Sequence, residues 1–266
     1  MANTISVREG VRAGYGFIPA AWRAVPGALV LAALTGAGYF YADAAHLGRP
    51  AVLAALVAHF LVGAVAQGAL FRLALDQPGR GSLGLQWRGL ETRLLGLTLL
   101  TLLFFVVVVL VLTIVVAAAI IGVSIAAGAP FQPNSPDWLG ELGLVGGLIL
   151  AVVVIVAYVV FVWLAVRLSL ASAATAAVGR IQLLSTFPLT KGHVWRLLGS
   201  LLIVAAPVIV AALATGVATG LTGGLPGPAT AGFAVVTGLL VAFVYLPAAA
   251  GLLVYLYRRL APSGAV

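Results

Sequence analysis

The sequence has no cysteine, a single methionine and few charges, since only 8% of its 266 residues are Asp, Glu, Lys or Arg. Without cysteine there is no disulfide framework, no thiol nucleophile and no thiolate metal site. An ordinary soluble domain carries about 25% charged residues, so this chain has too few to cover a water-facing surface. Hydrophobic residues make up 63% of the chain. We therefore expect an integral membrane protein, with lipid as the solvent for most of the chain.

Six apolar runs are long enough to cross a bilayer, which takes about 17–25 residues of helix. Runs such as Phe104–Ile121 are continuously apolar, whereas the strands of a membrane barrel alternate, so the runs predict helices. The predicted fold class is all-α: a polytopic transmembrane helical bundle of six spans, forming one domain over residues 1–266. The spans are predicted near residues 25–42, 51–71, 94–128, 142–166, 197–225 and 229–257.

Two of these runs allow more than one interpretation. The third has 35 residues, or about 52 Å of straight helix against a hydrocarbon core of about 30 Å. It must tilt, project from the membrane, or begin as an interfacial helix that turns inward. The first run follows a basic segment and precedes Ala42-Asp43-Ala44, which resembles a signal-peptide cleavage site. Its apolar stretch is longer than the usual core of about 7–15 residues, so we count it as a span.

The basic residues fall on one side of the predicted spans. Thirteen of the 14 Lys and Arg residues lie before span one, between spans two and three, between spans four and five, or after span six. Only Arg49 lies on the other side. By the positive-inside rule the basic side is cytoplasmic, which predicts a multi-pass protein of the bacterial inner membrane with both termini in the cytoplasm. The net charge of +8 then reflects topology, and no nucleic-acid partner is predicted.

A Trp-Arg pair stands just before three of the predicted spans, in each case on the cytoplasmic side. Indole prefers the headgroup level of a membrane and guanidinium reaches lipid phosphate, so we interpret the pairs as interfacial anchors. They also suggest a threefold repeat of a short interfacial helix followed by a transmembrane hairpin. The alternative, that interfacial preference alone produced the three pairs, stays open. The anchor residues are Trp22, Arg23, Trp87, Arg88, Trp195 and Arg196.

Residues 1–24 are predicted to form an interfacial segment. Their apolar residues recur every three or four positions and make one helical stripe, which indicates an amphipathic helix on the cytoplasmic leaflet. The stripe consists of Val7, Val11, Tyr15, Ile18 and Trp22. Gly14, Gly16 and Pro19 weaken this helix.

The connection between spans four and five carries a family resemblance. An Arg closes a span at position 167, a short apolar stretch follows, and then come Leu189-Thr-Lys-Gly192 and Trp195-Arg-Leu-Leu-Gly199. This pattern resembles the bacterial glycerophosphoryl diester phosphodiesterase membrane domains and the related YciC-like proteins, as do the six-span layout and the Arg258-Arg259 ending. In that family a separate soluble barrel performs the hydrolysis. This chain ends nine residues after its last predicted span, so the resemblance implies a membrane domain without that barrel and without its enzymatic activity.

No combination of side chains predicts catalysis. The six carboxylates lie in connections or at span ends, and the three histidines lie on three different segments, so we predict no enzyme, no metal site and no cofactor. His59 is the one titratable group in mid-span; we interpret it as a hydrogen bond to a neighbouring helix, with a proton relay as the alternative. Glycines spaced by four residues predict close helix packing in spans four and five, at Gly143, Gly147, Gly216, Gly220 and Gly224.

The leading hypothesis is a non-catalytic protein that organises lipids or assembles with other proteins through a basic cytoplasmic collar. Its predicted partners are membrane lipids, above all anionic ones. The candidate contacts with lipid headgroups are Arg88, Arg93, Arg167, Lys191 and Arg196.

The alternative is a transporter or lipid translocator. Pro207 and Pro247 lie about 15–18 Å from the cytoplasmic ends of spans five and six, near mid-bilayer. Each removes a backbone hydrogen bond and can kink its helix, and some transporters build their site from such paired breaks. Ordinary kinked packing is the simpler interpretation. A membrane enzyme is the third hypothesis.

Overall fold

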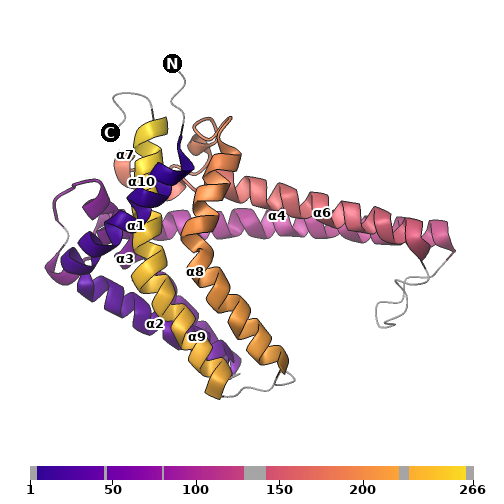
Figure 1. The fold of residues 1–266 in the computed structure, drawn as a ribbon, viewed down its shortest axis with the longest axis horizontal. Helices are drawn as coiled ribbons and strands as arrows, with labels where there is room; N and C mark the ends of the chain where they lie inside the picture. Colours follow the sequence, from indigo (N-terminus) through magenta and orange to yellow (C-terminus); the bar gives the residue numbers. More distant parts are fainter. Residues whose placement is uncertain (1–4, 45–46, 80, 129–141, 222–227, 262–266) are drawn as a thin grey trace. The chain divides into compact units, whose positions relative to one another are not determined.

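The structure is a computed structural model that describes residues 5–44, 47–79, 81–128, 142–221 and 228–261. Over these ranges every regular element is helical and no strand occurs, which confirms the all-α class. The chain divides into two compact units, one made of Met1–Thr98 and Leu168–Val266 and the other of Leu99–Arg167. We refer to them as the large and the small unit and describe each by itself (Figure 1).

The long helices coincide with the predicted apolar runs. They are α2 (Pro26–Ala44), α3 (Arg49–Ala74), α4 (Gly89–Ala127), α6 (Gly143–Leu168), α8 (Val194–Leu221) and a last run that comprises α9 (Pro228–Leu240), the π-helical turn η3 (Val241–Tyr245) and α10 (Leu246–Leu260). Within the described ranges, five helices are long and apolar enough to cross a membrane. A sixth follows if α1 (Val7–Ala24) and α2, which are bent by 103°, count as one span. Such helices suit a membrane-embedded protein.

Helix α4 is longer than a bilayer needs. It runs unbroken for 39 residues, or about 58 Å. The interpretation that this run begins as an interfacial helix and then turns inward is therefore wrong, because the backbone stays helical from Gly89 to Ala127 without a turn. The two other interpretations, a tilt of α4 and its projection from the membrane, can still account for the extra length.

The chain turns sharply between α1 and α2. Ser6 begins α1 by accepting a 3.4 Å hydrogen bond from the backbone N–H of Glu9, a typical N-cap. Val25 leaves the helical conformation and Pro26 starts α2, where its fixed φ suits a first helical residue. A short 3₁₀ turn, η1 (Ser82–Gly84), packs against the bend between α1 and α2. Gly84 has a φ of +79°, and a Cβ there would lie 2.7 Å from the Cβ of Val25, so only glycine fits.

Glycine also joins α1 to α10. A Cβ at Gly14 would lie 2.7 Å from the carbonyl oxygen of Ala248, and one at Gly251 would lie 2.6 Å from the Cβ of Phe17. The two backbones therefore approach more closely than any larger residue allows. Gly14, which has a low helix propensity, thus has a packing role, and the positions of α1 that are buried in the protein are Gly10, Gly14 and Ala21.

The glycines predicted to form packing ladders do not do so in the described part of the chain. No atom of another element lies within 4 Å of a Cβ built at Gly143, Gly147, Gly216 or Gly220, and Gly224 lies outside the described residues. In the small unit α4 and α6 instead meet through side chains, with the rings of Phe105 and Phe161 centred 5.0 Å apart. The four-residue spacing of these glycines marks a row of small residues, but it does not determine whether a neighbouring helix lies against that row.

Candidate functional site

Several segments that carry or flank basic residues meet at one end of the large unit. The hydroxyl of Tyr255 on α10 donates to the Glu9 carboxylate on α1 at 2.7 Å. Arg258 of α10 pairs with Asp76, just beyond α3, at 3.3 Å. Two further bonds add α7 (Ala171–Val178) and the start of α8: Gln77 donates to the Ala176 carbonyl at 3.3 Å, and Arg196 donates to the Ile5 carbonyl at 3.2 Å.

Four of the five predicted headgroup contacts lie in this unit and are exposed: Arg88, Arg93, Lys191 and Arg196. Arg93 lies beside the C-terminus of α7, where a Cβ at Gly179 would be 3.5 Å from its guanidinium. A helix C-terminus favours a cation, so this contact also holds the Arg93 side chain in place. The fifth predicted contact, Arg167, belongs to the small unit, where its guanidinium lies 4.7 Å from the ring centre of Trp163.

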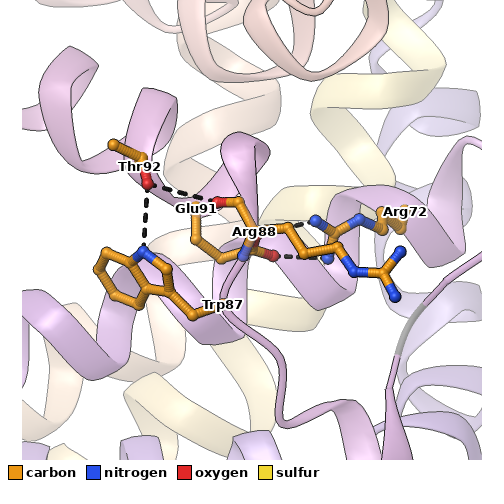
Figure 2. A network of polar contacts seen from close by, with 5 residues as sticks. All are labelled: Arg72, Trp87, Arg88, Glu91 and Thr92. Carbon is orange, nitrogen blue, oxygen red and sulfur yellow. Dashed lines mark hydrogen bonds and ion pairs between the residues drawn. The ribbon is translucent and has the colours of Figure 1, made fainter.

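A buried ion pair joins α3 to α4 (Figure 2). The guanidinium of Arg72 donates to both carboxylate oxygens of Glu91, at 2.5 and 2.8 Å, and the side chains are 7% and 0% exposed. Gly68 on α3 makes room for this carboxylate, because a Cβ there would overlap it. A bidentate pair is the geometry that best offsets the cost of burying two charges. The sequence placed both residues between spans two and three and did not reveal their pairing.

The same carboxylate caps α4. The backbone N–H of Arg88 donates to Glu91 at 2.8 Å, as in a capping box. Thr92 accepts a 3.1 Å hydrogen bond from the indole of Trp87 and donates to the Arg88 carbonyl at 3.3 Å, so Figure 2 shows one connected network at this helix start. Glu91 therefore accepts three hydrogen bonds, two from the Arg72 guanidinium and one from the start of its own helix.

The three Trp-Arg pairs lie in three different local settings. Trp22 and Arg23 are near the end of α1, Trp87 and Arg88 precede α4, and Trp195 and Arg196 are in the first turn of α8. The indole of Trp22 donates to a distant carbonyl and that of Trp87 to a nearby hydroxyl, whereas Trp195 is 78% exposed. The predicted threefold repeat is not confirmed by these settings.

The two prolines have a relationship that the sequence did not reveal. Pro207 has no N–H to offer the carbonyl four residues earlier, that of Ile203, and Pro247 likewise leaves the carbonyl of Phe243 without its helical donor. Both carbonyls accept a hydrogen bond from α1. The hydroxyl of Tyr15 donates to Ile203 at 3.0 Å, and the indole of Trp22 donates to Phe243 at 2.8 Å.

Tyr15 and Trp22 are seven residues apart on α1 and therefore share one face of that helix. They belong to the predicted apolar stripe, so part of that stripe is directed at α8 and at η3. Pro207 lies within the uninterrupted helix α8, whereas Pro247 follows the π-helical turn, in which the N–H of Leu246 bonds to the carbonyl of Val241. The backbone groups that a transporter could use at these prolines already have donors from α1.

His59 does not form the predicted hydrogen bond through its Nδ1, which is buried and has no partner among the described residues. Its ring instead stacks on Tyr39 of α2, with centres 6.0 Å apart and planes inclined by 12°. His59 also contacts Gly36, at the place where α2 and α9 cross closely through Gly36 and Gly238. The prediction of a contact between neighbouring helices is correct in its location but wrong in its chemistry.

No group of three or more His, Cys, Asp or Glu residues that could hold a metal ion occurs within the described ranges. Comparisons of the chain with protein families, with curated proteins and with solved structures found no match. The site must therefore be interpreted from its own geometry.

Proposed function

We propose that this chain is a non-catalytic integral protein of the bacterial inner membrane. It crosses the bilayer six times, keeps both termini in the cytoplasm, and holds anionic lipid headgroups on a basic cytoplasmic collar. In the large unit the collar consists of Arg88, Arg93, Lys191 and Arg196, and Arg167 is the headgroup contact that the small unit provides. The resemblance to phosphodiesterase membrane domains fits this proposal, because it implies a six-span membrane domain.

The observation that carries the proposal is the meeting of the basic segments at one end of the large unit. The start of α1, the ends of α3 and α10, the helix α7 and the start of α8 are joined there by side-chain hydrogen bonds and an ion pair. These are the segments that the charge distribution assigns to one side of the membrane. Exposed Lys and Arg side chains at such a surface attract anionic lipids.

The same contacts support six crossings rather than five. The bond between Tyr255 and Glu9 holds the start of α1 against the end of α10. α2 packs against both α3 and α9, so it runs with the bundle and does not lie across its end. The bent pair α1 and α2 then acts as an interfacial helix followed by a span.

The lipid proposal is tested by the headgroups that co-purify with the protein. We expect the double substitution of Arg93 and Lys191 by Gln to lower retention of phosphatidylglycerol by about 25-fold, because each of the two cations near an anionic surface contributes about 1 kcal/mol, the equivalent of about fivefold. Native mass spectrometry at two salt concentrations measures retention and its salt sensitivity. Arg49→Gln is the matched control, as an exposed arginine on the predicted opposite side. Equal retention in the double variant and the control contradicts the proposal.

A further inference from the structure

A cleft of about 650 Å³ opens between α1, the end of α3 and α10. Its volume lies within the range of about 300–1,000 Å³ that is typical of small-molecule sites. All the residues that line it belong to the large unit, at the end where the basic segments meet. No residue predicted as a headgroup contact lines this cleft, so it is distinct from the collar.

The lining has two chemically different parts. The inner wall is apolar, with Phe17 from α1, Leu73 from α3 and Val254 from α10. The rim is polar and carries Asp76, Arg258 and Arg259, together with the Tyr255 hydroxyl. An apolar wall below a charged rim matches an amphiphile, whose chain would lie along the wall and whose headgroup would meet the rim.

The charges on the rim favour an anionic headgroup. Arg258 and Arg259 are consecutive, and each is paired with a carboxylate: Asp76 at 3.3 Å and Glu9 at 3.9 Å. The four side chains are between 44% and 82% exposed, so these pairs are well solvated and contribute little on their own. A phosphate can therefore replace a carboxylate as the partner of a guanidinium and gain a bidentate contact.

We propose that this cleft binds one membrane amphiphile with a phosphate headgroup, such as phosphatidylglycerol, its chain against Phe17 and Leu73 and its phosphate on Arg258 and Arg259. The inference deepens the proposed function, on which it rests, by adding a defined binding cleft to a collar that attracts headgroups less specifically. Asp76 then competes with the phosphate for Arg258.

Two pairs of variants test the cleft in purified full-length protein with added phosphatidylglycerol, by native mass spectrometry. The first pair tests the headgroup: Arg258→Gln is expected to weaken binding about fivefold, the equivalent of one surface cation, whereas Asp76→Asn is expected to maintain or strengthen it. If Arg258 served only to pair with Asp76, both substitutions would weaken binding in parallel, and that result would overturn the proposal.

The second pair tests the apolar wall. Ala20 of α1 lines the cleft and is exposed, so Ala20→Phe fills the cleft without touching a charge. Gly16→Phe adds the same side chain to the same helix at a position that does not line the cleft and has open space around it. We expect Ala20→Phe to lower lipid binding several fold and Gly16→Phe to leave it unchanged. Equal binding by these two variants would contradict the cleft.

Free glycerol phosphate distinguishes a lipid from a soluble phosphate as the source of the headgroup. We expect it to bind much more weakly than phosphatidylglycerol and to be indifferent to Ala20→Phe. Binding as tight as that of the lipid would mean that the apolar wall is unused and would refute the amphiphile. If the Arg93 and Lys191 variant loses lipid while the cleft variants do not, the cleft fails and the collar stands; if none of them loses lipid, both fail.

Discussion

The indole N–H of Trp22 donates a 2.8 Å hydrogen bond to the carbonyl of Phe243, the acceptor that Pro247 leaves without its helical donor. The hydroxyl of Tyr15 likewise donates to the carbonyl of Ile203, which Pro207 leaves without its helical donor. One helix, α1, thus supplies donors to two other helical segments at the positions where each lacks one. An unpaired carbonyl in an apolar bundle costs free energy, so these two bonds make α1 part of the bundle as well as of its surface.

Replacing Trp22 by Phe tests the first of these bonds. We expect the loss of free energy of unfolding to be larger by about 1–3 kcal/mol when Pro247 is present than in a Pro247→Ala background. Alanine at position 247 restores the N–H that pairs with the Phe243 carbonyl, and the packing lost with the indole is common to both backgrounds. Unfolding by SDS titration in mixed micelles measures the four variants of this cycle. Equal losses in the two backgrounds would show that the bond contributes nothing.

The bond from Tyr15 allows a cleaner substitution, because Tyr15→Phe removes only the hydroxyl. We expect a loss of about 1 kcal/mol or more that disappears when Pro207 is replaced by Ala. Tyr158→Phe is the control, since the Tyr158 side chain is 68% exposed and its hydroxyl has no partner in the described part of the chain. The same unfolding titration decides the matter, and a loss independent of residue 207 rules out the proline relationship.

The buried pair of Arg72 and Glu91 should be among the most sensitive positions of the protein. Glu91→Ala leaves a buried guanidinium without its partner, and we expect a loss of about 3–5 kcal/mol in the free energy of unfolding. Replacing both residues by Met and Leu should recover much of that loss, because it removes both buried charges. Breaking the exposed pair through Asp76→Asn is the comparison, with an expected effect of about 0–1 kcal/mol. Equal effects at the two pairs would contradict the burial described for Glu91.

Gly68→Ala probes the same carboxylate from its other side. A methyl group there would overlap the Glu91 side chain, so we expect destabilisation even though alanine is the better helix former. Gly63→Ala on the same helix meets nothing within 4 Å and should be neutral or stabilising. The comparison uses one substitution at two positions, and a stabilising Gly68→Ala would be inconsistent with the contact.

Hydropathy predicted where the long apolar helices lie, because each apolar run must satisfy its own backbone in lipid. The contacts between helices were not predictable in the same way. Gly14 and Gly251 join α1 to α10 through the absence of a side chain, which leaves no periodic signal. The partner of Trp22 is a backbone carbonyl 221 residues away. Every residue has such a carbonyl, so the side chain at position 243 does not predict this hydrogen bond.

The pair of Arg72 and Glu91 did leave a usable signal. Glu91 stands three residues after the residue that precedes α4, the spacing of a capping box, and this marks a carboxylate directed back at its own helix start. The members of the proposed basic collar could be predicted from the sequence, because the positive-inside rule depends on where Lys and Arg stand along the chain and not on how the helices pack. Which basic residues of the chain are engaged in internal contacts, as Arg72 and Arg258 are, depends on packing that only the fold supplies.

The sidedness of the chain is the central claim, and the absence of native cysteine allows a direct measurement with single cysteines. Arg8, Leu47 and Ser82 are exposed and lie in the first turn of α1, between α2 and α3, and before α4. With a membrane-impermeant maleimide on intact cells, we predict that Leu47→Cys is labelled, whereas Arg8→Cys and Ser82→Cys are labelled only after permeabilisation. Labelling of Arg8→Cys in intact cells would mean that α2 does not cross the membrane. Labelling of Ser82→Cys in intact cells would mean that the collar lies outside the cell. Either result contradicts the proposed topology.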